Sequence, residues 1–259
     1  MRVLKLTLSY DGTAYAGWQV QPDQRTLQET LEIALKKIVG KSARTVASGR
    51  TDAGVHALEQ VVSFATECEL PADVLLKALN AHLPADIAIL EVREAAPGFH
   101  AICDAVRKRY RYVIHDGTIR DVFARHYAWH LPRRLNSEAM HRAAQNLVGT
   151  HDLRSFETTG SERSSSVRTI LDISVRRQEE NNSNRIVVEV EADGFLYNMV
   201  RAIVGSLVEV GRGARDEDWL VEVVAAKDRR AAGMTAPPQG LFLVHVTYDD
   251  DTPTVADLA

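Results

Sequence analysis

Two runs of strands and helices in the same order follow one another along the chain, and this repetition constrains the fold most. Hydrophobic spacing predicts a first run with strands at residues 3–10, 43–49, 58–65 and 87–92 and helices at residues 27–38 and from residue 71. The second run has predicted strands at residues 109–114, 169–175, 185–190 and 241–246, and helices at residues 137–148, 195–210 and from residue 216. Both runs have the order β-α-β-β-α-β, and the second has an additional helix.

This order predicts an α+β fold of two ferredoxin-like (RRM-like) halves, with antiparallel sheets side by side and a cleft between them. We expect an N-terminal domain over residues 1–104, a C-terminal domain over residues 105–248 and an acidic, disordered tail over residues 249–259. RNA-recognition domains use the same unit to present a sheet face to single-stranded bases. The unit also has many other roles, so its order does not specify a function.

The composition is that of a globular protein with an ordinary hydrophobic core. Of the 259 residues, 45% are hydrophobic and 25% are charged, which excludes collagen-like, disordered and disulfide-scaffold classes. No N-terminal stretch is typical of a secretory signal, and no run of about 18 apolar residues predicts a membrane span. Cys68 and Cys103 share no CxxC spacing, so we expect reduced thiols, no metal site and a cytoplasmic location.

The charge is distributed unevenly along the sequence. The net charge of −4, taken alone, argues against a nucleic-acid partner. However, residues 1–104 carry a net charge of −3, residues 105–248 carry +3, and the short tail carries −4. The acidic total therefore conceals a basic C-terminal half.

The basic charge is concentrated in residues 105–134, where eight basic residues accompany two acidic ones and alternate with aromatic residues. Arginine binds phosphate through two hydrogen bonds, and aromatic rings stack on bases, so this combination is typical of single-stranded RNA sites. Arg107, Arg109 and Arg111 are therefore candidate RNA-binding residues. The alternatives are a solvated charged face and a coding bias that favours arginine, which outnumbers lysine 24 to 7.

The segment GRTDAGVHA, residues 49–57, lies between two predicted strands. Its two glycines allow a tight or left-handed backbone, and it presents the cation of Arg50 two residues before the carboxylate of Asp52. From these residues alone, Asp52 is either a functional carboxylate or the cap of an Asx turn.

GRTDAGVHA resembles the catalytic loop of the tRNA pseudouridine synthase A family, and further motifs of this family follow in order over nearly the whole chain. They are Tyr10-Asp11-Gly12-Thr13, Gly17-Trp18-Gln19, Arg25-Thr26-Leu27-Gln28, Phe99-His100-Ala101, Arg109-Tyr110-Arg111-Tyr112, His151-Asp152-Leu153-Arg154-Ser155-Phe156, Val167-Arg168-Thr169-Ile170, Gly194-Phe195-Leu196-Tyr197-Asn198-Met199-Val200-Arg201 and Ala236-Pro237-Pro238-Gln239-Gly240-Leu241.

The resemblance implies an isomerase that converts uridine to pseudouridine in the anticodon arm of tRNA, on the 3′ side of the loop and the adjoining stem. It also implies a homodimer, a catalytic cleft between the two halves, and a reaction that uses no cofactor or metal. The enzyme must break an N-glycosidic bond, turn the uracil and rejoin it through carbon. A carboxylate can attack C1′, take a proton from C2′ or add to C6 of the base, and the sequence leaves these three routes open.

By motif match, Asp52 is the catalytic carboxylate, and it needs a nearby cation or hydrogen-bond donors to stay ionised. Arg201 matches the family's cation, and on a helix over residues 195–210 it would share a face with Tyr197. Tyr110 matches the active-site tyrosine that stacks on the target uracil. The structural alternatives are a surface ion pair for Arg201 and a core position for Tyr110.

The resemblance also implies two further contacts to RNA. Leu241 matches a residue that packs on the base from the other side, and its alternative is a core position. Arg50 matches the residue that enters the space left by the flipped nucleotide, and its alternative is a salt bridge to Asp52. The chain departs from the family pattern at Ile102 and Cys103, where a basic contact is expected, and at Glu59, where a small residue is common.

Two other functions compete with the synthase. A non-catalytic RNA-binding or RNA-folding module would need the basic residues and the aromatic rings, but a carboxylate beside a polyanion would only lower its affinity. An unrelated small-molecule enzyme has less support, because the sequence has no P-loop, no GxGxxG motif after a strand and no GxSxG elbow.

Overall fold

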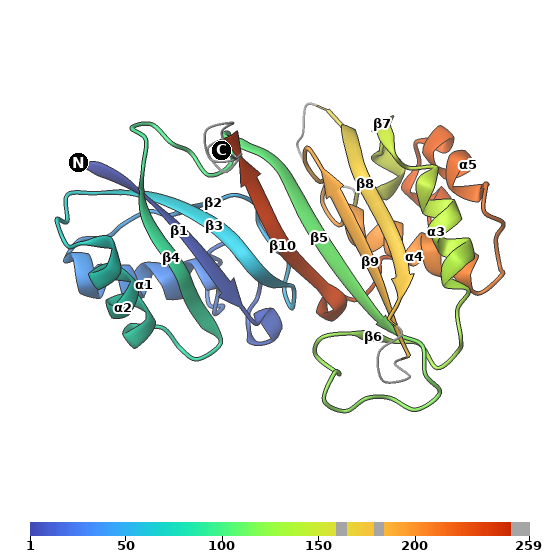
Figure 1. Ribbon diagram of the computed structural model, residues 1–259, viewed down its shortest axis with the longest axis horizontal. Coiled ribbons are helices and arrows are strands. Elements are labelled where there is room, and N and C mark those ends of the chain that lie inside the picture. Colours follow the sequence, from blue (N-terminus) through green and yellow to red (C-terminus); the bar gives the residue numbers. More distant parts are fainter. Residues whose placement is uncertain (159–164, 179–183, 250–259) are drawn as a thin grey trace, which may run out of the picture. The chain divides into compact units, whose positions relative to one another are not determined.

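The computed structural model describes residues 1–158, 165–178 and 184–249, which form two compact units. The first unit comprises residues 1–106 together with residues from 242 onward, and the second comprises residues 107–241 (Figure 1). Each unit is described by itself.

The first unit is a sheet with strand order β4-β1-β3-β10, and the short strand β2 also pairs with β3. Strand β1 is antiparallel to both β3 and β4, whereas β10 runs parallel to β3. The elements in chain order are β1 Arg2–Tyr10, the 3-10 turn η1 Gly12–Ala14, α1 Leu27–Val39, β2 Val46–Ala47, β3 His56–Thr66, α2 Ala72–His82, β4 Ile87–Ala95 and, from the chain's other end, β10 Leu241–Tyr248.

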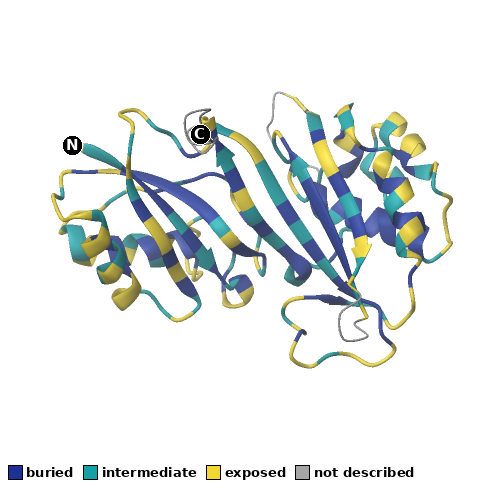
Figure 2. Ribbon diagram, in the orientation of Figure 1, coloured by how far each residue is buried: buried dark blue, intermediate teal, exposed yellow. Residues whose placement is uncertain are grey.

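Local sequence signals explain the helix boundaries in this unit. The Thr26 side chain accepts a hydrogen bond from the backbone N–H of Glu29 and so caps α1 at its N-terminus. Gly40 ends the same helix with a left-handed backbone at φ 73°. Leu4, Leu6 and Leu8 alternate along β1 and are almost fully buried, as expected for the sheet face that packs against helices. In β4, buried residues alternate with exposed ones at the start of the strand (Figure 2).

The second unit is a sheet with strand order β5-β9-β8-β7 in which neighbouring strands are antiparallel, and strand β6 pairs in parallel with β5. Its elements are β5 Ala105–His115, β6 Trp129–His130, α3 Ser137–Gln145, β7 Gly149–Asp152, η2 Arg154–Phe156, β8 Val167–Arg177, β9 Arg185–Ala192, α4 Met199–Gly211, α5 Trp219–Ala226, η4 Arg229–Ala231 and η5 Pro238–Gly240.

One face of this second sheet is the hydrophobic core of the unit. Tyr112 and Ile114 of β5, Val188 of β9 and Ile173 of β8 are at most 1% exposed. Helix α3 packs against β8 and against α4, so the helices cover this face (Figure 1). The side chains that alternate with these residues belong to the opposite face of the sheet.

The structure confirms a mixed α+β fold and most of the expected elements. It adds the short strands β6 and β7, begins α5 at Trp219 rather than at residue 216, and differs at three further segments. The helix expected over residues 195–210 begins only at Met199, because Asn198 has a left-handed backbone at φ 61°. The strand expected over residues 43–49 is reduced to Val46–Ala47, and the helix expected to reach residue 148 ends at Gln145.

The expected turn at residues 179–184 and the acidic tail at residues 249–259 lie outside the described residues except for residues 184 and 249. No helix in the described part of the chain is long and apolar enough to cross a membrane.

Candidate active site

The loop that carries Asp52 connects β2 to β3 in the first unit. It turns where the backbone N–H of Val55 donates a hydrogen bond to the carbonyl oxygen of Asp52 over 3.1 Å. Gly54 has a φ of 78°, a conformation that favours glycine. Val55 is buried, whereas Asp52 is only half-buried, so the carboxylate lies at the surface of a well-packed turn.

A network of buried polar side chains fixes the start of this loop. The Gln60 amide, which is fully buried in β3, donates to the carbonyl oxygen of Gly49 over 2.8 Å and accepts from the Ser48 hydroxyl over 2.7 Å. The hydroxyls of Tyr10 and Thr51 share a hydrogen bond of 2.8 Å, and the Gln60 amide also reaches Tyr10 at 3.4 Å. Because buried polar groups are costly to leave without partners, this network restricts the loop to one conformation.

Burial raises the pKa of Tyr10 to about 12, although the hydrogen bonds to Thr51 and Gln60 oppose the shift. The Tyr10 hydroxyl therefore stays protonated throughout the neutral pH range.

The segment after β1 lies directly against the Asp52 loop. The backbone N–H of Trp18 donates to the carbonyl oxygen of Thr51 over 2.9 Å. A Cβ at Gly17 would lie 2.8 Å from the same oxygen, and a Cβ at Gly12 would lie 2.0 Å from the carbonyl oxygen of Val55. Glycine is therefore required at both positions for the backbone to approach the loop.

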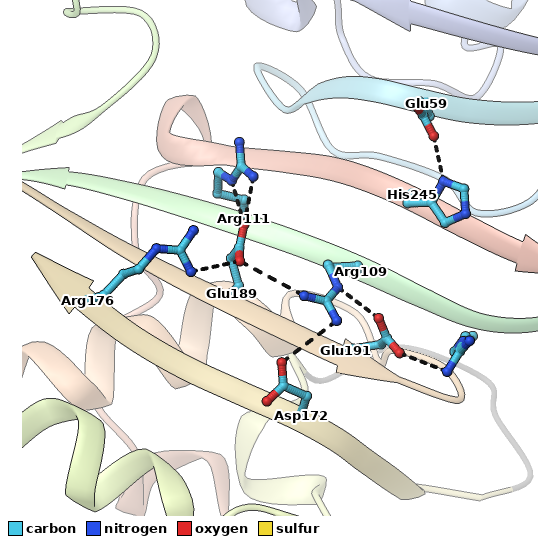
Figure 3. Close-up of polar contacts among 9 residues, drawn as sticks. Glu59, Arg109, Arg111, Asp172, Arg176, Glu189, Glu191 and His245 are labelled. Atoms are coloured by element: carbon cyan, nitrogen blue, oxygen red, sulfur yellow. Dashed lines mark hydrogen bonds and ion pairs between the residues drawn. The ribbon is translucent and has the colours of Figure 1, made fainter. Parts of the chain in front are cut away.

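His56, the first residue of β3, anchors the far end of the loop. Its ring is 1% exposed, it stacks on Phe242 of β10 with a centroid distance of 4.7 Å, and its Nδ1 accepts a hydrogen bond from the N–H of Gly12. Farther along β3, the carboxylate of Glu59 pairs with the imidazole of His245 at 2.5 Å (Figure 3). Glu59, which stands where the family commonly has a small residue, thus has a partner in His245 on the neighbouring strand.

Tyr110 lies on β5 in the second unit. It is 8% exposed, and its ring makes an edge contact with the Phe195 ring at a centroid distance of 4.8 Å. Both rings are thereby held in place by packing, which is the property that a stacking platform needs.

Arg201 lies in the first turns of α4 and binds two neighbouring segments. Its Nε donates to the carbonyl oxygen of Ala236 over 2.7 Å, and a terminal nitrogen donates to Oδ1 of Asn198 over 2.7 Å. The expectation that Tyr197 and Arg201 share one helical face is wrong, because Tyr197 precedes the helix. The side chain of Asn198 and the carbonyl oxygen of Ala236 are the hydrogen-bond acceptors that orient the guanidinium.

Leu241 follows a segment that packs closely against the Tyr112 side chain in the same unit. The Tyr112 hydroxyl donates to the carbonyl oxygen of Pro237 over 2.7 Å, and a Cβ at Gly240 would lie 2.7 Å from the Tyr112 ring. Burial raises the pKa of Tyr112, and the positive charge of Arg201 opposes part of that shift. Leu241 itself is 6% exposed.

Arg107, Arg109 and Arg111 lie on the face of β5 opposite Tyr110, because successive residues of a strand point to opposite sides. Each is paired with a carboxylate of β9. The Nε of Arg109 donates to Glu191 over 2.8 Å, Arg107 lies 3.4 Å from Glu191, and Arg111 lies 2.7 Å from Glu189 (Figure 3). The positive charge of the β5 arginines is thus largely balanced by the carboxylates of β9.

The comparison with known families shows which family the chain belongs to. The model of a family described as tRNA pseudouridine synthase matches residues 7–102 and 143–249, and these ranges contain the Asp52 loop, Arg201 and Leu241. The chain belongs to the tRNA pseudouridine synthase family. It is therefore an isomerase that acts on uridine in tRNA.

Curated relatives agree with the family model. The chain is similar to proteins named tRNA pseudouridine synthase A in three bacteria. It is 48% identical to that of Moorella thermoacetica over 96% of this chain and 100% of the relative. It is 47% identical to that of Geobacillus sp. (strain WCH70) over 95% and 98% of the two chains, and 44% identical to that of Thermoanaerobacter pseudethanolicus over 96% and 100%.

In this pseudouridine synthase, the predicted site residues divide between the two units. Asp52 and Arg50 share one loop of the first unit, whereas the other candidates all belong to the second, namely Tyr110, Arg201, Leu241, Arg107, Arg109 and Arg111. Among the described residues, no group of three or more His, Cys, Asp and Glu side chains could hold a metal ion.

Sequence reasoning missed the residues that support the loop. Gln60 and Tyr10 contact Gly49 and Thr51 only after β1 and β3 have paired, so no local pattern indicates their role. The sequence did contain a signal that Glu189 and Glu191 pair with the arginines of β5. Their alternation with valine on β9 matches the alternation of arginine with tyrosine on β5.

Proposed function

We propose that this synthase isomerises uridine to pseudouridine in the anticodon arm of tRNA, on the 3′ side of the loop and the adjoining stem, with Asp52 as the catalytic carboxylate. The observation that carries the proposal is the construction of the Asp52 loop. A half-buried carboxylate lies on a turn whose two ends are held by fully buried side chains, Gln60 and His56. Such rigidity suits a reacting group better than a solvated Asx turn.

The chemistry requires a group that can open and re-form the bond between C1′ and the base. A carboxylate can attack C1′, take a proton from C2′ or add to C6, and each route needs the ionised form of Asp52. We assign to Arg201 the role of the cation that keeps this carboxylate ionised. Its two hydrogen bonds, to Ala236 and Asn198, support a fixed position for that charge.

We assign the flipped uracil to Tyr110 and Leu241, and the gap that it leaves in the RNA to Arg50. Extruding a nucleotide costs a few kcal/mol of unstacking, which a guanidinium plane in the gap can partly offset. The edge contact of Tyr110 with Phe195 and the fixed start of β10 after Gly240 support rigid positions for the two residues around the base.

The strand order supports two ferredoxin-like halves with the domain boundary near residue 104. In the first unit, the order β4-β1-β3 with β2 on β3, together with two helices, is that of the ferredoxin-like unit. In the second unit, β5, β9 and β8 have the order of the corresponding strands.

The decisive experiment measures pseudouridine in the anticodon arm of tRNA after incubation with the protein and with the variant Asp52→Ala. We expect turnover by the wild type and none by the variant, with tRNA binding retained because phosphate contacts supply most of the affinity. Asp73→Ala, which removes an exposed carboxylate of α2, is the matched control and should leave turnover unchanged. A wild type that binds tRNA without modifying it would instead support an RNA-binding or RNA-folding module.

We also propose a homodimer that binds tRNA in the cytoplasm without a cofactor. The family resemblance supports the dimer, since each tRNA would then contact surface from both subunits. Sedimentation at micromolar concentration tests this part, and a monomer in the presence and absence of tRNA would contradict it.

A further inference from the structure

The face of the second sheet that the helices leave uncovered carries a dense set of ion pairs. We call it the arginine face, and it comprises Arg107, Arg109 and Arg111 of β5, Glu189 and Glu191 of β9, and Asp172 and Arg176 of β8 (Figure 3). The opposite face of the same strands is the hydrophobic core. The charged side chains of the arginine face therefore take no part in the hydrophobic core.

The two glutamates hold different positions in this network. Glu189 is 9% exposed and receives three arginines, with Arg111 at 2.7 Å, Arg176 at 3.0 Å and Arg109 at 4.0 Å. Its burial and its three partners make it a structural centre. Glu191 binds Arg109 at 2.8 Å and Arg107 at 3.4 Å, and both arginines keep more than a third of their side-chain surface exposed.

The arginines of this face remain available to another anion. The Arg107 and Arg109 side chains are 46% and 35% exposed, whereas that of Glu191 is 13% exposed. An RNA phosphate can therefore reach the two arginines from solvent, where it competes with Glu191 for them. Removing the Glu191 carboxylate would remove the nearest competitor of a phosphate at Arg107 and Arg109, since arginine binds phosphate and carboxylate with the same paired geometry.

We propose that Glu191, assisted by Asp172, is an internal competitor that limits how tightly the arginine face binds the RNA backbone. Four arginines and three carboxylates leave the face with one excess positive charge. An RNA that offers only phosphates would then bind weakly, whereas tRNA adds contacts that read its shape and the target base. This inference rests on the proposed function, because it takes tRNA as the ligand.

The test compares Glu191→Gln with the wild type in binding to unmodified tRNA and to an unrelated RNA of similar length over a range of salt concentrations. Glutamine preserves the shape of the side chain and removes only its charge. We expect about three- to tenfold tighter binding of both RNAs at about 50 mM salt and a log–log salt dependence steeper by up to about one. Because phosphate contacts are common to both RNAs, the ratio of the two affinities should stay the same.

Glu217→Gln is the matched control. Glu217 is also an ion-paired carboxylate of the second unit, bound to Arg142 at 2.6 Å, so its loss changes the net charge equally. Equal effects of the two substitutions on RNA binding would show that only the net charge of the protein matters. That result would overturn the proposal. Weaker binding by Glu191→Gln would also overturn it, because the carboxylate would then position the arginines for RNA.

Asp172→Asn provides a second variant if Glu191→Gln does not fold. Its carboxylate is 52% exposed and lies 3.8 Å from Arg109, so we expect a change in the same direction and of smaller size. Pseudouridine formation by the wild type is measured in the same samples. If the wild type forms pseudouridine and both variants bind RNA as the wild type does, only this inference is rejected. If the wild type forms no pseudouridine, the proposed function is rejected.

Discussion

The backbone of Gly12 contacts that of Val55 so closely that a Cβ on Gly12 would lie 2.0 Å from the Val55 carbonyl oxygen. Because the clashing atom belongs to the backbone, no side-chain rotation can relieve it. We expect Gly12→Ala to displace the Asp52 loop, to lower the free energy of unfolding by about 1–3 kcal/mol and to reduce pseudouridine formation by more than about tenfold. Thermal unfolding and a tRNA modification assay measure the two effects.

Gly40→Ala is the control for this prediction. Gly40 ends α1 with a φ of 73°, and a Cβ there would meet nothing within 4 Å. The substitution should cost about 1 kcal/mol of stability through backbone strain and leave the activity of the folded protein unchanged. Full activity in Gly12→Ala would show that the close approach does not position the loop.

Tyr10→Phe removes the hydroxyl that joins Thr51 to the Gln60 network. We expect a loss of about 1–2 kcal/mol of stability, because two buried polar groups lose a partner, and a several-fold lower kcat at a similar KM. Tyr127→Phe, at a ring that is 42% exposed, should change neither quantity appreciably. An equal effect of the two substitutions on kcat would argue against a positioning role for Tyr10.

Asn198 has a left-handed backbone and accepts a hydrogen bond from Arg201 while its amide donates to Thr158. We expect Asn198→Gly, which tolerates the backbone, to lower kcat/KM by about tenfold because Arg201 loses an acceptor. Asn198→Ala should show the same kinetic loss and a further destabilisation of about 1 kcal/mol from strain. Wild-type kinetics in Asn198→Gly would exclude Asn198 as the residue that orients Arg201.

Asp116 pairs with Arg177 at 2.8 Å, and its carboxylate is fully buried. Burial alone would raise the pKa of Asp116, but hydrogen bonds from Arg177 and from the N–H of Leu135 outweigh it and lower the pKa below its usual value of 3.8. A lowered folded pKa means that the pair stabilises the protein above the unfolded pKa, and that this contribution is lost as the pH falls through the folded pKa.

We therefore expect Asp116→Asn to lose about 3 kcal/mol at neutral pH and to show a shallower loss of stability below about pH 4 than the wild type. Denaturant unfolding at several pH values measures both effects. The exposed pair of Glu217 with Arg142 serves as the control, and Glu217→Gln should change the stability little at any of these pH values. Parallel pH profiles of Asp116→Asn and the wild type would contradict the assignment.

Local signals were sufficient for most elements of the fold. The cap at Thr26, the glycine at Gly40 and the alternation along β1 each depend on neighbours within a few residues. The structure places the ends of α1 and β1 within one residue of the predicted ranges. The predicted start of the helix at residues 195–210 was wrong for a specific reason. Its hydrophobic spacing continues through Leu196, but the backbone turns at Asn198, whose side chain is bound by Arg201 and Thr158.

The candidate site was predictable only in part. The residues of the loop around Asp52 stand together in the sequence, so their unusual combination and their family resemblance could be recognised directly. The contacts that support this loop could not be predicted, even though Gly12 belongs to a family motif. Gln60 and Gly12 become neighbours of the loop only when β1, η1 and β3 come together.

The sequence by itself determined the order of the elements, the Asp52 loop and the basic character of β5. Only the tertiary structure decided that the arginines of β5 lie opposite Tyr110 on the other face of the sheet and that β9 supplies their counter-charges. The physical reason is range. Helix caps and strand alternation are set by interactions over a few residues, whereas the pairing of Arg109 with Glu191 joins positions 82 residues apart through the register of two strands.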